Sequence, residues 1–248
     1  MMQMHYNGQL IRSAACALLL AESLLYAEKI TFSADSMSGK VGDKTDSTFL
    51  NGEACVITET MEIYSDSIGM SGKDFRFIEA SGNVKGKNTE SALEFTCGKL
   101  KYDRETKIAQ LMDNVDLTDT KNNVTAKAQI IEYNQETDTA VMQIEIELKQ
   151  KDNICNGAYA IYRKADQMLE LSGNAQIKQG NDTFRAQEIT LNLDSQEITL
   201  DGRVKGSIVD ERKNKTEAES ETTADTDAES EAEIESEAPE SKESPSDE

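Results

Sequence analysis

The sequence has 248 residues, of which 47 are acidic and 26 basic, so its formal net charge is −21. This acidic excess argues against a nucleic-acid-binding protein, because neutralising phosphates requires a basic face. The acid is concentrated in residues 217–248, which hold 14 acidic residues and one base. The preceding stretch, 28–216, holds 32 acidic and 24 basic residues and is long enough for one domain with a sizeable core.

Residues 1–27 are typical of a secretory signal peptide. Arg12 precedes an apolar segment, 14–25, that is shorter than the roughly 20 residues a membrane span needs. Because the small residue Ala27 ends this region, we expect cleavage before Glu28 and export of the mature chain. Two alternatives are an uncleaved anchor and a lipoprotein at Cys16, although here the apolar run follows the cysteine instead of preceding it.

The residue types for most catalytic or metal sites are scarce. The single histidine, His5, lies in the predicted signal, so a mature chain has no imidazole for acid–base catalysis, nucleophile activation or metal binding. The mature chain keeps Cys55, Cys97 and Cys155 without a CxxC spacing, which gives a zinc site no support. We expect small buried side chains there, with one disulfide and a leftover thiol as the alternative. The sequence therefore predicts no enzyme, no cofactor and no metal.

The chain from about 30 to 205 repeats with a period of about 30 residues. Four apolar positions, spaced by 31, 29 and 29 residues, align successive copies of the repeat. A short turn-like pair follows each of them after eleven residues. Two earlier copies share the turn, at Gly52 and at Gly82-Asn83. The aligned positions are Tyr102, Tyr133, Tyr162 and Leu191, followed by Asp113-Asn114, Ile144-Glu145, Gly173-Asn174 and Gly202-Arg203.

Each copy predicts two strands. Phe95 and Cys97 alternate with polar residues, as do Leu100 and Tyr102, but the step between Cys97 and Leu100 is three. Such a step keeps both pairs on one face only if the strand bulges or bends. We therefore expect an all-β fold of about a dozen strands without a helix, forming one curved sheet folded over on itself. Because Ile144-Glu145 replaces Gly-Asn, the sequence leaves open whether the fourth copy has a kink.

The alternation also assigns the faces of the sheet. Lys101, Glu132, Arg163 and Glu170 fall on the outer face. The opposite, apolar stripe is either a sealed core or an elongated groove. Its residues are Leu100, Tyr102, Leu111, Ile131, Tyr133, Met142, Tyr162, Leu169, Leu171, Ile189, Leu191 and Leu200.

Several blocks resemble the LptA/OstA-like family of periplasmic lipopolysaccharide-transport bridge proteins, over about residues 30–208. They are Phe32-Ser-Ala-Asp-Ser-Met37, the segment from Leu169 to Ile177, and the segment from Phe184 to Leu191. The resemblance implies a half-open, V-shaped β-jelly roll over 28–210. It also implies that lipopolysaccharide or a related envelope glycolipid lies with its acyl chains along the apolar stripe just named. The lipid would move passively from the inner to the outer membrane through jelly rolls stacked edge to edge.

The resemblance further implies partners at the sheet edges. These would be inner-membrane and outer-membrane transport components, and further copies in a head-to-tail homo-oligomer. An unpaired first or last strand is a template for such pairing. The candidate assembly residues are Ile30, Phe32, Val204 and Ile208. The alternatives are an inner-membrane-anchored sister component and a structural or adhesive β-solenoid; a glycosidase would need two acids converging in a cleft.

Residues 211–248 are low in complexity, acidic and without aromatic residues, so we expect a disordered tail. It is either a solvating appendage or a guard against uncontrolled stacking at the last strand. Within residues 28–210, the sequence shows no basic cluster that would require the bound lipid to have a phosphate-rich headgroup.

Overall fold

The computed structural model describes residues 29–40 and 47–209. The predicted signal peptide and its cleavage site, and the predicted disordered tail, lie outside the described residues. The proposed limits of the three segments, 1–27, 28–210 and 211–248, therefore stay predictions.

Fourteen strands form one antiparallel sheet, and the all-β prediction is confirmed. One short 3₁₀ helix, η1 (Lys73–Phe75), interrupts the strands, which the sequence did not predict. In chain order the strands are β1 (Thr31–Ser33), β2 (Ser36–Lys40), β3 (Ser47–Ile57), β4 (Met61–Ser71), β5 (Phe77–Asn88), β6 (Leu93–Asp103), β7 (Ile108–Asp119), β8 (Val124–Asn134), β9 (Thr139–Gln150), β10 (Asn153–Arg163), β11 (Met168–Gln179), β12 (Asp182–Asn192), β13 (Ile198–Asp201) and β14 (Lys205–Ser207).

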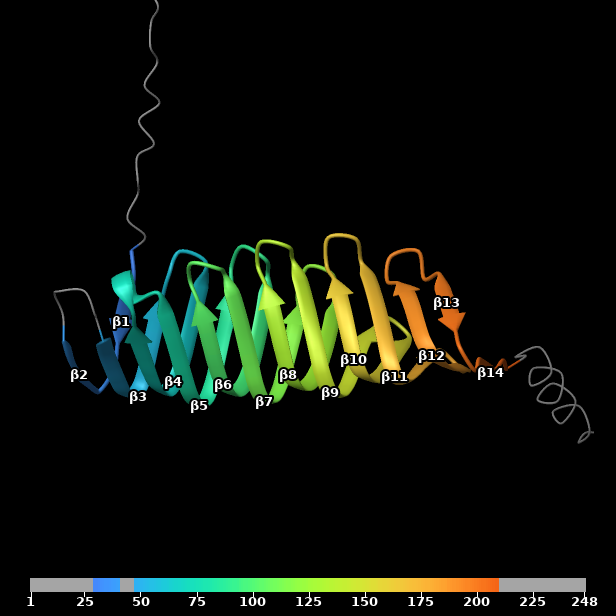
Figure 1. Ribbon diagram of the computed structural model, residues 1–248, viewed down its shortest axis with the longest axis horizontal. Coiled ribbons are helices and arrows are strands. Elements are labelled where there is room, and N and C mark those ends of the chain that lie inside the picture. The colour runs from blue at the N-terminus through green and yellow to red at the C-terminus, as the bar shows by residue number, and fades with distance from the viewer. Residues whose placement is uncertain (1–28, 41–46, 210–248) are drawn as a thin grey trace, which may run out of the picture.

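The ten long strands, β3 to β12, are a meander in which each strand pairs with the next. At each end, two short strands share one long neighbour: β1 and β2 both pair with β3, and β13 and β14 both pair with β12. Figure 1 shows the strands following one another along the long axis, with the two ends of the sheet at opposite ends of the molecule. The sheet is therefore open and has an edge at each end.

Alternation of apolar and polar residues explains why these segments form strands. In β6 the side chains of Leu93, Phe95 and Cys97 are buried, and the alternation resumes at Leu100. The register with β7 shifts between Thr96 and Lys99, at the predicted step of three. Similar shifts occur halfway along each neighbouring pair of long strands, so they align across the sheet.

In every second long strand, from β3 to β11, the bend contains a pair of residues in the left-handed region. Gly173 and Asn174 have φ values of 72° and 60°, which glycine and asparagine adopt readily. Ile144 and Glu145 have φ values of 67° and 56°, so the fourth copy has the same bend. Ile144 is 52% exposed, and Gln143 and Ile146 on its two sides are paired with neighbouring strands, which constrains the backbone between them.

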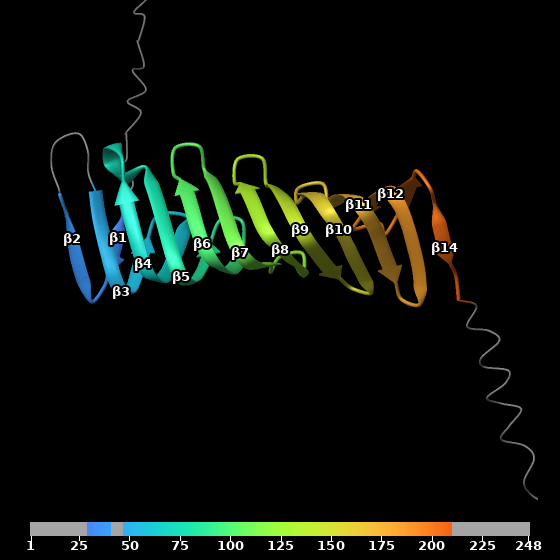
Figure 2. The ribbon, with the colours of Figure 1, turned by 60° about the horizontal axis from the view of Figure 1, so that its bottom comes forward.

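Because every long strand bends at its middle, the sheet is folded double into two layers (Figure 2). The inward side chains of both layers form one apolar cluster that extends from Leu50 on β3 to Leu193 beyond β12. Many of its members are fully enclosed; Ile63, Ile131 and Leu148 are each 0% exposed.

Candidate functional site

The structure gathers the predicted apolar stripe in the interior between the two layers. Eleven of its twelve residues are 0–4% exposed, and Leu200 on the short strand β13 is partly buried against the same cluster. Lys101 and Glu132 point outward and are exposed. Arg163 and Glu170 form an ion pair on the outer face. The interior is thus continuous and apolar along the meander.

The hairpin turns of the two layers meet at the side opposite the bend, and polar contacts join them there. We call this side the mouth and define it by Asp119, Tyr162, Lys164, Gln196 and Asn153. The Tyr162 hydroxyl donates a hydrogen bond to Oδ2 of Asp119 over 3.1 Å. Nζ of Lys164 lies 3.6 Å from Oδ1 of the same carboxylate, and these two side chains are 6% and 2% exposed.

Further contacts at the mouth extend this joint in both directions. Lys164 also donates to the Ser91 carbonyl. Towards β12, the Gln196 side chain donates to Oε1 of Gln150 over 3.2 Å and accepts a hydrogen bond from Nδ2 of Asn153. The mouth is therefore closed by polar groups, whereas the interior behind it is apolar.

Sequence reasoning missed the mouth, although a signal was present. Asn88, Asp119 and Gln150 occupy the same position in successive copies, and they are 3%, 2% and 5% exposed. Asp119 accepts hydrogen bonds from the backbone N–H groups of Lys121 and Asn122, a common role for a turn residue. A polar residue recurring every 31 positions next to an apolar stripe was the available indication.

Some buried polar atoms along the same side have no hydrogen-bond partner within the described residues. They are Nδ2 of Asn88, Nε2 of Gln135 and Oδ1 of Asn153. An unpaired buried polar group typically costs about 1–3 kcal/mol. The closed arrangement is thus less favourable at the mouth than in the interior.

The titratable groups of the interior are held in their neutral forms. Burial, followed by the hydrogen bond to Asp138, raises the pKa of Tyr133 above its ordinary value. Burial and the charge of Asp119 do the same for Tyr162. Burial raises the pKa of the Cys97 thiol to about 11 and that of Cys155 to about 12. These groups can donate hydrogen bonds and pack, but they are poor bases and nucleophiles at neutral pH.

The cysteines are buried and unlinked. Cys55, Cys97 and Cys155 are all free thiols, so no disulfide joins any two of them.

The predicted assembly residues lie at the two ends of the sheet. Phe32 on β1 is 46% exposed, and Ile30 before it packs partly against the core. At the other end Val204 and Ile208 flank β14 and are 52% and 75% exposed. The short strands at both ends have a partner on one side only.

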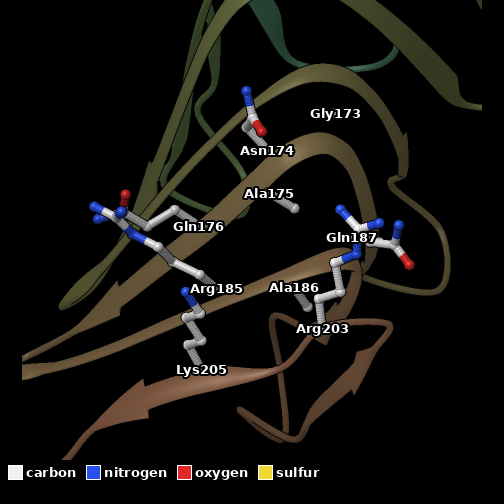
Figure 3. A pocket seen from close by; sticks show the side chains of 9 residues that line it. All are labelled: Gly173, Asn174, Ala175, Gln176, Arg185, Ala186, Gln187, Arg203 and Lys205. Atoms are coloured by element: carbon white, nitrogen blue, oxygen red, sulfur yellow. The ribbon is translucent and has the colours of Figure 1, made fainter.

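A basic cleft lies at the β12 end of the sheet, where the sequence indicated no basic cluster. Arg185, Arg203 and Lys205 line it together with Gln176 and Gln187, and its volume is about 660 Å³ (Figure 3). The three cations are separated along the chain, and the pairing of β12 with β14 brings two of them together.

Within residues 29–40 and 47–209, no helix has the length and apolar character needed to cross a bilayer.

Comparison with known proteins gives two family matches. Residues 28–145 match the family described as OstA-like protein, and residues 156–197 match that of the LptA/(LptD N-terminal domain) LPS transport protein. A search of curated protein sequences gives no significant match.

Among solved structures, LptH of Pseudomonas aeruginosa matches. It is described as the LptA-homologous periplasmic component of the conserved lipopolysaccharide transport device. The two sequences are 12% identical over 73% of this chain and 96% of that chain, with a TM-score of 0.23.

Proposed function

Since the chain belongs to the LptA/OstA-like family of transport proteins, which are not enzymes, we propose that it is a periplasmic bridge for lipopolysaccharide or a related envelope glycolipid. In this proposal residues 1–27 direct export and are removed, and residues 28–210 carry the lipid from the inner to the outer membrane. The observation that carries the proposal is the continuous apolar interior, which runs from β3 to β12 and is bounded on one side by a polar mouth.

The interior offers acyl chains an environment without water. Transfer of a chain from water stabilises it by roughly 0.8 kcal/mol for each buried CH₂ group. The inward residues Ile131, Met142 and Leu171 are spread over three strands, so a long chain can contact several repeats at once. The polar residues of the mouth would then face the boundary between acyl chains and headgroup.

Side chains fill the interior in the closed structure, so lipid entry requires the two layers to separate. The bend joins the layers covalently, whereas at the mouth they are joined by hydrogen bonds and by the Lys164–Asp119 ion pair. We infer that the layers part at the mouth and pivot at the bend. The unpaired atoms of Asn88 and Asn153 reduce the free energy that opening requires.

No covalent chemistry is assigned to the protein. Transfer would be passive, and a partner machine must supply the energy. Free main-chain groups on β1 and β2 at one end, and on β13 and β14 at the other, can pair with a further copy or with inner-membrane and outer-membrane components. Stacking in this way would extend one apolar interior across several molecules.

Extraction of the exported protein tests the cargo. The protein is purified from the cell envelope without detergent, extracted with organic solvent and analysed by mass spectrometry. We expect an acylated glycolipid at a substantial fraction of the protein's molar amount. The same chain, refolded from denaturant without envelope, is the control and should yield none. Equal amounts of lipid in both samples, or none in either, would contradict the proposal.

Light scattering tests the assembly. We expect concentration-dependent self-association of the mature chain, and Ile208→Pro should weaken it because proline removes a main-chain donor beside β14. The control Ile208→Thr keeps the donor and should associate like the unmodified chain. A strict monomer at high concentration would contradict head-to-tail stacking but would not bear on the proposal that the protein binds lipid.

A further inference from the structure

The basic cleft at the β12 end has an unbalanced charge. Arg185, Arg203 and Lys205 are exposed, and no acidic side chain lines the cleft. Within the described residues, no ion pair joins any of the three to a carboxylate. In Figure 3 the Arg185 and Lys205 side chains lie next to each other on neighbouring strands, and Arg203 approaches Gln187.

The pairing of β12 with β14 forces two like charges together. Arg185 and Lys205 are direct cross-strand partners in the antiparallel register. Like charges in this position repel each other and destabilise the pairing of the strands. An anion in the cleft would remove this repulsion, so the arrangement favours an anionic occupant.

We propose that the acidic segment 217–248 of the same chain docks on this basic cleft. The segment holds 14 acidic residues and one base, a net charge of −13, and thus complements the three cations. The lining amides of Gln176 and Gln187 add hydrogen-bond donors that suit carboxylate oxygens.

The length of the chain allows the docking. The structure's last described residue, Val209, lies four residues beyond Lys205, a distance of about 13 Å along an extended strand. Glu217 follows eight residues after Val209, and eight residues span at most about 26–29 Å. The first acidic residues can therefore turn back to the cleft, and tethering gives them an effective concentration of about millimolar.

The docked segment would lie beside the unpaired edge of β14. If the proposed edge-to-edge stacking is correct, docking limits the pairing of this end with a second copy. The docking itself does not depend on that function, and the experiment below measures it without lipid or partner.

Zero-length carboxyl–amine cross-linking of the full mature chain tests the proposal. At low ionic strength we expect Lys205 to link to carboxylates of 217–248 about five-fold or more above exposed lysines elsewhere, because opposite charges attract over the Debye length. Lys107 and Lys121 serve as reference lysines, since both are exposed on distant turns. Added salt should abolish the preference.

Two matched variants locate the cause. Arg185→Gln/Arg203→Gln keeps the reporter Lys205 and should reduce its links to the level of the reference lysines. Lys107→Gln/Lys121→Gln removes the same charge elsewhere and should leave the Lys205 links unchanged. A mixture of isotope-labelled and unlabelled chains should give links within one chain.

Three results would overturn the inference. They are Lys205 links no more frequent than those of Lys107, links unaffected by the two arginine substitutions, and links found only between copies. Binding of inorganic phosphate to the cleft, together with no tail links when phosphate is absent, would assign the cleft to a different anion.

Discussion

The bend and the mouth join the same two layers in opposite ways. At the bend the layers are joined by the chain itself, through pairs of left-handed residues such as Gly173 and Asn174. At the mouth they are joined by non-covalent contacts of side chains, with Lys164 and Asp119 at the centre. The proposed entry of lipid depends on this contrast, because it requires a hinge on one side of the interior and a separable joint on the other.

Removing the buried ion pair at the mouth should have the largest effect on stability. In Asp119→Asn the amide keeps the turn hydrogen bonds but leaves the Lys164 ammonium buried without its counter-charge. Removing one member of a buried pair typically destabilises a protein by about 3–5 kcal/mol. We expect a loss in this range, measured by urea unfolding.

The exposed pair Arg163–Glu170 is the control for that measurement. Its side chains are 40% and 44% exposed, and exposed pairs contribute about 0–1 kcal/mol. Glu170→Gln should therefore change the free energy of unfolding by less than about 1 kcal/mol. Equal effects of Asp119→Asn and Glu170→Gln would mean that the mouth does not hold the layers together.

Truncation of apolar side chains in the interior should have the next largest effect on stability. The loss should be smaller at the end of the sheet than in its middle. Leu171 and Leu200 occupy the same repeat position, but Leu171 is 2% exposed whereas Leu200 is only partly buried. Leu171→Ala should cost about 2–5 kcal/mol, and Leu200→Ala clearly less, because it leaves a smaller cavity. If denaturant unfolding gives equal losses, the packing is not concentrated in the middle of the sheet.

At the bend, relieving the backbone strain at Ile144 should stabilise the protein. Ile144 is a β-branched residue with a φ of 67°, a conformation that costs a non-glycine residue about 1–2 kcal/mol. Ile144→Gly should stabilise the protein by about 0.5–1 kcal/mol after the entropy of the more flexible unfolded chain is subtracted. Gly173→Ala, at the equivalent position, should destabilise it by about 1–2 kcal/mol. Thermal unfolding measures both, and a loss on Ile144→Gly would show that its side chain contributes more than its backbone strain.

An acid-sensitive contact near the turns has a small effect that appears only at low pH. The hydrogen bonds from Arg76 lower the pKa of Asp103 from 3.8 to about 2. A carboxylate whose pKa is depressed by folding stabilises the fold above its unfolded pKa, and this contribution is lost as the pH falls from about 4 to about 2. Because Asp103 is partly solvated, we expect about 1 kcal/mol. The difference in unfolding free energy between the unmodified chain and Asp103→Asn should shrink across this window; a constant difference would contradict the assignment.

Sequence patterns predicted the fold because the spacing of apolar residues and the positions of Gly-Asn pairs depend on local backbone geometry. The step of three between Cys97 and Leu100 indicated the shift in register, and Gly-Asn pairs indicated the bend. Ile144-Glu145 gave no such indication, because a β-branched residue rarely has a positive φ. Its conformation is imposed by the bends of the neighbouring strands, which is a property of the whole sheet.

The mouth and the basic cleft could not be predicted from local pattern. Asp119 and Lys164 belong to different layers and are 45 positions apart, so their contact depends on how the two layers are offset. Arg185 and Lys205 are 20 positions apart and meet only because β14 pairs with β12 beyond β13. Both sites arise from tertiary register.

Site-specific photo-crosslinking in the envelope tests the central claim, that lipid lies between the two layers. A photoreactive side chain is placed inward at Tyr133, Met142 or Leu171, or outward at Glu132 or Glu170, and captured glycolipid is detected by immunoblotting. A one-residue step reverses the face of a strand, so the two sets differ only in which side they present. We predict capture at the inward positions and none at the outward ones. A folded protein that captures lipid at neither set would show that the interior is a sealed core, and equal capture at both sets would contradict the assignment of faces.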